Sequence, residues 1–183
     1  SSVKPTAFHT WLHDLHLCGL LKTVFTMNID GLEQAVGLPD ETVFYLHGRY
    51  DRLRCFRCNG VQLLTRKIKR VIKKNGHVLC TDCSNSLKRE CSKGHMISDV
   101  VVYHDCRIQP HGEMIMRAAA ENFDLILIVG ASLDSNVSGT SSLITELQRS
   151  GAPLLYVNPS APPSAYRSLN HMSVSADDFA ALN

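Results

Sequence analysis

Two Cys-x-x-Cys pairs constrain this chain more than any other feature of its sequence. Cys55 and Cys58 form the first pair, and Cys80 and Cys83 form the second. Such a pair brings two thiolates close enough to share one ion, and two pairs supply the four sulfur ligands of a closed, tetrahedral zinc site. We therefore expect these four cysteines to bind one structural Zn²⁺.

Other interpretations of the cysteines stay open at this point. The four thiols could be redox-active or simply free, and Cys91 could replace Cys83 as the fourth ligand. Cys18, Cys91 and Cys106 lie outside the pairs and leave an odd number. This usage fits reduced thiols in the nucleus or the cytoplasm better than it fits secretion.

Outside residues 54–96 the sequence alternates between apolar strand-like runs and helix-like segments. The runs 125–129 and 154–157 are continuously apolar, as in strands that are buried on both faces of a parallel sheet. Further strands are expected at 23–28, 43–46 and 172–175, an extended segment at 99–103, and helices at 5–21, 111–122, 141–149 and 177–182. This alternation predicts an α/β fold with a parallel sheet.

Residues 54–96 differ in composition and read as an inserted zinc-binding module. The cysteine pairs bracket a basic, amphipathic stretch at 65–74. This stretch could contact nucleic acid or an acidic partner, but a solvated helix face is the favoured interpretation.

The formal charge of the whole chain is only +2, so we expect no nucleic-acid partner. No apolar run approaches the ~18 residues of a membrane span.

Three short polar motifs follow predicted strands, where open α/β sheets bind their ligands. They are Asn28 with Asp30, His47 with Gly48, and the G-A-S-L run that contains Ser132. Taken singly, each has a plain structural explanation, because Asn and Asp favour turns and a lone histidine is more often structural than catalytic.

Taken in order around the two cysteine pairs, these motifs resemble the sirtuin family of NAD-dependent protein-lysine deacylases. Residues 26–33 read T-M-N-I-D-G-L-E and are similar to the sirtuin signature T-Q-N-I-D-x-L-E. Residues 47–48 match its H-G pair, 99–105 resemble D-V-V-x-F-G-E, and 130–133 resemble G-T-S-L. The amino-acid sequences of residues 103–105 and of the 158–162 loop resemble those of a fungal, nuclear branch of the family that acts on histones.

The resemblance implies a role for each matching residue. His47 would be the general base toward the cofactor ribose, and Asn28 and Asp30 would line the nicotinamide side of an NAD site. The phosphate, ribose and adenine would meet Ser132, Asn158, Ala176 and Asp177. An acyl-lysine peptide, for example of a histone, would add as a strand along Val101, Val102 and Tyr103.

The chain also departs from the family pattern. Met27 stands where the family has Gln, Ala131 where it has Thr, and His104 where it has Gly. The glycine-rich segment G-A-G-x-S, which holds the cofactor's pyrophosphate, does not occur in these 183 residues. The resemblance therefore implies an incomplete doubly wound, Rossmann-like core at 1–53 and 97–183, without its first strand.

Three hypotheses for function follow from these observations. The first is a sirtuin-type binding or scaffold module that is inactive alone. The second is an active NAD-dependent protein-lysine deacetylase whose opening segment is supplied separately or is missing from this sequence. The third is a zinc-dependent protein- or nucleic-acid-interaction module without a cofactor. In the first two, a protein partner or a second copy of the chain is expected to complete the sheet.

Overall fold

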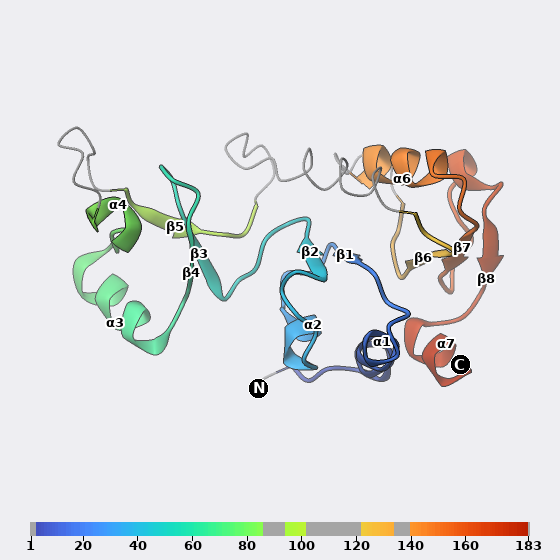
Figure 1. Ribbon diagram of the computed structural model, residues 1–183, viewed down its shortest axis with the longest axis horizontal. Coiled ribbons are helices and arrows are strands. Elements are labelled where there is room, and N and C mark those ends of the chain that lie inside the picture. Colours follow the sequence, from blue (N-terminus) through green and yellow to red (C-terminus); the bar gives the residue numbers. More distant parts are fainter. Residues whose placement is uncertain (1–2, 86–93, 102–121, 134–139, 183) are drawn as a thin grey trace. The chain divides into compact units, whose positions relative to one another are not determined.

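The computed structural model describes residues 3–85, 94–101, 122–133 and 140–182 (Figure 1). The chain divides into two compact units, and each is considered by itself. The first unit comprises Ser1–Val24, Leu32–Phe44 and Gln109–Asn183. The second unit comprises Phe25–Gly31 and Tyr45–Ile108.

A parallel sheet forms the centre of the first unit. Its strands are β6 (Ile126–Val129), β7 (Leu154–Val157) and β8 (Asn170–Met172), in the order β6-β7-β8. Ile126 lies opposite Leu154, and Tyr156 lies opposite His171. Helix α6 (Thr140–Arg149) runs along this sheet in Figure 1, and Ile144 of α6 packs with Ile128 and Tyr156 in one buried cluster. The parallel α/β architecture is therefore confirmed.

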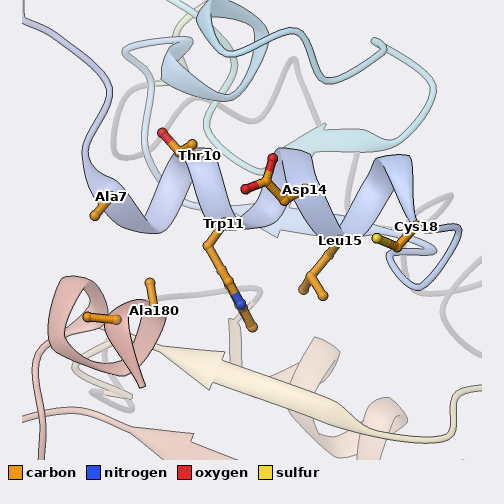
Figure 2. A pocket seen from close by; sticks show the side chains of 8 residues that line it. Ala7, Thr10, Trp11, Asp14, Leu15, Cys18 and Ala180 are labelled. Atoms are coloured by element: carbon orange, nitrogen blue, oxygen red, sulfur yellow. The ribbon is translucent and has the colours of Figure 1, made fainter. Parts of the chain in front are cut away.

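Two helices from opposite ends of the sequence pack together in the same unit. α1 (Ala7–Leu17) contacts α7 (Ala176–Ala181), and the Trp11 ring meets the Phe179 ring edge to face at 5.5 Å. Figure 2 shows Trp11 and Leu15 pointing from α1 toward the side where Ala180 lies. The short helices α2 (Leu32–Ala35) and η1 (Ser164–Tyr166) complete the described helices of this unit.

A pair of short strands leads to the first two polar motifs. β1 (Val24–Thr26) pairs with β2 (Val43–Tyr45) in a two-stranded sheet. The N–H of Val24 donates to the carbonyl of Thr42 at 2.8 Å, and the N–H of Leu46 donates to the carbonyl of Thr26 at 2.9 Å. Both bonds advance in the same direction along the two strands, so the strands are parallel.

The second unit is built around the cysteine pairs. β3 (Arg52–Cys55) pairs antiparallel with β4 (Val61–Leu63) and with β5 (Met96–Ser98), in the order β4-β3-β5. Helices α3 (Arg66–Asn75) and α4 (Thr81–Asn85) complete its described elements. The unit's buried cluster comprises Leu53, Cys55, Ile68, Cys80, Cys83 and Met96.

Several predicted elements have different bounds in the structure. The strand expected at 172–175 is β8 and ends at Met172, and the helix expected at 5–21 is confined to α1. The segment 99–103 was expected to be extended. β5 ends at Ser98, and the described residues 99–101 belong to no strand. The helix expected at 111–122 lies outside the described residues, except for residue 122.

The predicted module boundaries stay a prediction. β3 begins at Arg52 and β5 ends at Ser98, so both strands extend beyond the expected limits of 54 and 96. Of the helices in the described part of the chain, none combines the length and the apolar character needed to cross a membrane.

Candidate active site and zinc centre

The loop after β1 carries Asn28 and Asp30. The N–H of Asn28 donates to the Thr26 hydroxyl at 3.2 Å, which fixes the turn at the end of the strand. Gly31 follows with a φ of 72°, a conformation that side chains rarely tolerate. The loop is also tied to the segment after β2, because the N–H of Tyr50 donates to the carbonyl of Ile29 at 3.1 Å. Asn28 is exposed and Asp30 is half-buried, so both are accessible to a ligand.

His47 lies two residues after the end of β2, half-buried and held through its backbone. Its carbonyl accepts from the N–H of Val101 at 2.9 Å. Gly48 has a φ of 70°, and a Cβ at this position would lie 1.9 Å from the carbonyl oxygen of Asp99. Only glycine allows the backbone of the H-G pair to approach the 99–101 segment this closely. Three segments that are distant in sequence therefore meet around His47: 26–31, 45–50 and 99–101.

Two ion pairs support this arrangement, and the sequence did not single them out. Buried Arg49 forms a bidentate pair with Asp51, with Nε to Oδ1 at 2.8 Å and Nη2 to Oδ2 at 2.6 Å. A Cβ on Gly31 would lie 3.2 Å from Nε of Arg49, so the guanidinium packs against the loop that follows Asp30. The R-x-D spacing at 49–51, directly after the H-G pair, is the signal that could have revealed this pair.

The second pair fixes the start of the predicted peptide-binding segment. The carboxylate of buried Asp99 accepts from Nε of Arg54 at 2.7 Å, and the N–H of Asp99 donates to the carbonyl of Arg52 at 3.2 Å. Val101, two residues further on, is half-buried. Val102 and Tyr103, the other predicted peptide contacts, lie outside the described residues.

The remaining predicted cofactor residues lie in the first unit. Asn158, directly after β7, donates through Nδ2 to the carbonyl of Ala131 at 3.2 Å and to the hydroxyl of Tyr156. Tyr156 in turn donates to the carbonyl of Ala131 at 2.7 Å. These bonds join the carboxyl ends of β6 and β7, and Ser132 is exposed beside them. A Cβ on Gly130 would meet no described atom within 4 Å, so the described residues leave space at this position.

Asp177 has a structural contact that the sequence did not predict. Its Oδ1 accepts from the N–H of Phe8 at 2.8 Å, near the beginning of α1. The N–H groups of a first helical turn lack partners within the helix, so Asp177 caps α1 from α7. This bond and a second from Thr6 lower the pKa of Asp177 below its ordinary value. Ala176 precedes it and is half-buried; the adenine contact of both residues stays a prediction.

The four paired cysteines converge as predicted. Their Sγ atoms all lie within 4.8 Å of one another, with Cys55 to Cys83 and Cys58 to Cys80 both at 3.7 Å. A tetrahedron of sulfurs at ~2.3 Å from a central zinc has edges of ~3.8 Å, so the spacing fits that ion. Cys91, the alternative ligand, lies outside the described residues.

The thiols differ in how readily they ionise. Burial raises the pKa of Cys83 to about 12 and also raises that of Cys80. Burial opposes ionisation of Cys55 as well, but N–H groups of Cys58 and Arg57 stabilise its thiolate and lower its pKa to about 7. Close packing around the sulfurs extends to the backbone, because a Cβ on Gly94 would lie 2.5 Å from Sγ of Cys55. The donor set is therefore four sulfurs in a closed, mostly buried centre.

The fold and these sites define an α/β protein that has a parallel sheet, polar residues after its strands and a four-cysteine centre. A model of the Sir2 family matches residues 1–137. The match covers most of the chain, so this protein belongs to the Sir2 family.

Individual relatives and solved structures agree with this assignment. The NAD-dependent protein deacetylase of Thermodesulfovibrio yellowstonii is 29% identical over 86% of this chain and 56% of its own length. The NAD-dependent histone deacetylase SIR2 of Candida albicans is 27% identical over 86% of this chain and 29% of its own length. A solved structure described as "The Structural basis of Sirtuin Substrate Affinity" is 26% identical, with a TM-score of 0.71 over 98% of this chain and 68% of that chain. The chain thus spans about half or less of the length of these two curated relatives.

Proposed function

We propose that this chain carries the general-base, nicotinamide-side and peptide-binding residues of an NAD-dependent protein-lysine deacetylase. The observation that carries the proposal is the convergence of Asn28, Asp30, His47 and Val101 in the second unit, tied by backbone bonds between their segments. The names of the bacterial and Candida relatives support NAD-dependent deacetylation, and the second name supports a histone substrate. A histone substrate would in turn favour the nucleus.

The chain's own residues suit the parts of this reaction that a protein must supply. His47 is a side chain of the type that titrates near neutrality, as required of a group that accepts a proton from a ribose hydroxyl. Asn28 and Asp30 present an amide and a carboxylate that can orient a carboxamide. NAD, when bound, would supply the sugar carbon that bonds to the acyl oxygen as its bond to nicotinamide breaks.

The first unit offers the second set of cofactor residues. Ser132 and Asn158 follow adjacent parallel strands, where ligands of open α/β sheets bind, and the described residues leave space at Gly130. The residues present therefore fit the ribose and phosphate side of NAD in part. The 183 residues contain no glycine-rich segment for the pyrophosphate, so we propose that they bind NAD weakly and do not turn it over alone.

A binding role without turnover is the second candidate function. Met27 favours it, because a thioether cannot donate the hydrogen bond that an amide offers at the corresponding position of the family signature. In this case the chain would bind an acetylated protein through the same segments and release it unchanged.

An NMR titration of the zinc-loaded, ¹⁵N-labelled chain tests the site. We expect an acetyl-lysine histone peptide to shift the amides of 28–31, 47–50 and 99–101, and to leave those of α3 unchanged. We expect NAD to shift the amides of 130–133, 158 and 176–177, and also those of Asn28, Asp30 and His47 on its nicotinamide side. The same peptide with unmodified lysine is the control. Equal shifts from both peptides, or shifts that exclude His47 and Val101, would contradict the proposed site.

A further inference from the structure

Helix α3 carries a concentrated charge of one sign. Six of its ten residues are cations and none is an acid. All six are exposed: Arg66, Lys67, Lys69, Arg70, Lys73 and Lys74. At 3.6 residues per turn they occupy one continuous face of about 160°. The three apolar residues of the helix lie on the opposite side.

The apolar side of α3 fixes the helix on the zinc centre. Ile68 is buried in the cluster that contains the cysteines, and Ile72 packs against that cluster. The Thr65 hydroxyl caps the first turn by accepting from the N–H of Ile68 at 3.3 Å, and Gly76 ends the helix with a φ of 75°. The cationic face therefore lies on a helix that is already ordered in the folded chain. Binding a partner does not have to order the backbone of α3.

The acidic residues that the structure describes do not neutralise this face. Within the described part of the chain, no carboxylate forms an ion pair with any of the six cations. Residues 54–96 contain eleven Lys or Arg against two Asp or Glu, whereas the rest of the chain contains eight against fifteen. The net charge of the whole chain is therefore small only because the positive charge of residues 54–96 is offset by the negative charge of the rest.

The chemistry of the face favours one class of partner. Lysine supplies four of the six cations, and lysine is depleted at protein–protein interfaces but binds phosphates well as a point charge. Insertion into a membrane surface needs an exposed apolar side, which α3 instead packs on the zinc centre.

We propose that the exposed face of α3 binds the phosphate backbone of a nucleic acid. The sequence alone favours a solvated helix face. Three observations favour a binding site instead: the helix is fixed, its six cations form no ion pair with a described carboxylate, and the positive charge is concentrated in this module. The face carries no aromatic or amide side chain for stacking on bases or reading their edges, so binding is independent of base sequence. This surface is distinct from the residues around His47.

Fluorescence anisotropy with a labelled DNA duplex of ~20 base pairs tests the proposal on the whole zinc-loaded chain. If all six cations contact phosphates, log K plotted against log[salt] has a slope of about −5. The double variant Arg70→Gln with Lys73→Gln removes two cations from the centre of the face. We expect it to bind about tenfold more weakly at low salt and to reduce the magnitude of the slope by about 2.

The matched control is Lys4→Gln with Arg167→Gln. It has the same net charge as the α3 double variant, but the two changed residues are exposed on the first unit. We expect its affinity to stay within about twofold of the unsubstituted chain. Zinc content and circular dichroism verify that both variants are folded. The proposal is overturned if the chain does not bind DNA at ~50 mM salt, or if both variants lose affinity equally. It is also overturned if polyglutamate or anionic vesicles bind as tightly as DNA, since an acidic protein or a membrane would then be the partner.

Discussion

Among single residues, Gly48 shows most clearly how backbone geometry places the candidate base. Its φ is positive, and its Cα faces the carbonyl of Asp99 so closely that no side chain fits. The adjacent His47 is therefore held against the segment that begins the predicted peptide-binding strand. A histidine followed by any other residue could not take this position without moving one of the two segments.

Substitution of Gly48 by alanine should be strongly destabilising. The new methyl group would overlap the Asp99 carbonyl in addition to straining φ, so we expect a loss of about 3 kcal/mol or more in the free energy of unfolding. Gly76→Ala is the matched control, because Gly76 has a φ of 75° but an added Cβ there would meet nothing within 4 Å. We expect it to cost only about 1 kcal/mol. Urea unfolding measures both, and equal losses would show that the close approach is not significant.

The sequence indicated the candidate site residues but not the residues that support them. Asn28, Asp30 and His47 follow predicted strands and match a motif, so they could be found without coordinates. Arg49 could not, because its importance comes from packing against Gly31 and pairing with Asp51, which depend on how the two loops meet. The contact between Asp177 and Phe8 joins residues 169 positions apart and has no local signal.

At the scale of elements, α7 adds a cap to the first turn of α1, beside the local capping box of Thr6 and His9. Thr6 is the N-cap residue by position, but Asp177 accepts from the N–H of Phe8. Packing of Trp11 on Phe179 accompanies this bond. The end of the chain thus stabilises its beginning.

Asp177→Ala should weaken the docking of α1 on α7. We expect a loss of about 1 kcal/mol at neutral pH, as for other helix caps. The pKa of Asp177 is lowered in the folded chain, so its contribution is present above the unfolded pKa of ~3.9 and is lost as pH falls through the folded value. The difference from the unsubstituted chain should therefore disappear in acid.

Hydrogen exchange at the Phe8 amide distinguishes this cap from a general charge effect. Asp178→Ala removes the same charge from the same turn of α7, but Asp178 bonds to Ser175 within its own helix. We expect protection of the Phe8 amide to fall in Asp177→Ala and to persist in Asp178→Ala. Equal exchange in the two variants would exclude the cap.

Zinc should determine the folding of the module that contains α3 and β3. Its buried cluster includes three of the four cysteines, so removal of the ion leaves little else to hold the elements together. We expect one zinc per chain, and a chelator should abolish exchange protection in α3 and β3 while β6 and β7 keep theirs. Cys55→Ser should lose the zinc, and Cys18→Ser, outside the cluster, should retain it. A chain that stays protected without zinc would contradict a structural role.

Fold class, the strands at 126–129 and 154–157 and the cysteine cluster could all be predicted, because continuous apolar runs and Cys-x-x-Cys spacing are local signals. The β4-β3-β5 sheet could not, since its strands are only three or four residues long, which is too short for a polar–apolar alternation to identify a strand. The bounds of β8 also differed, because its residues are exposed and lack an apolar pattern.

At the scale of the whole molecule, the main open question is what pairs with the edge of the parallel sheet. Among the described residues, β6 has a strand neighbour on one side only, namely β7. Its four residues are all apolar, and such an edge is a template for another strand. We expect the isolated chain to associate, either with a partner strand or with a second copy. Light scattering of the zinc-loaded chain measures this, and a stable, folded monomer would count against it.

A deacetylation assay tests most directly whether this chain carries a deacetylase site that is not sufficient alone. The zinc-loaded chain is incubated with NAD and an acetyl-lysine histone peptide, and deacetylated peptide is measured by mass spectrometry. We predict no product from the 183 residues alone. We predict NAD-dependent product when a segment that carries the family's G-A-G-x-S motif is fused to the chain. His47→Ala should abolish this product, and the control His77→Ala should retain it. Product from the chain alone, or a folded fusion without product that depends on His47, would contradict the account.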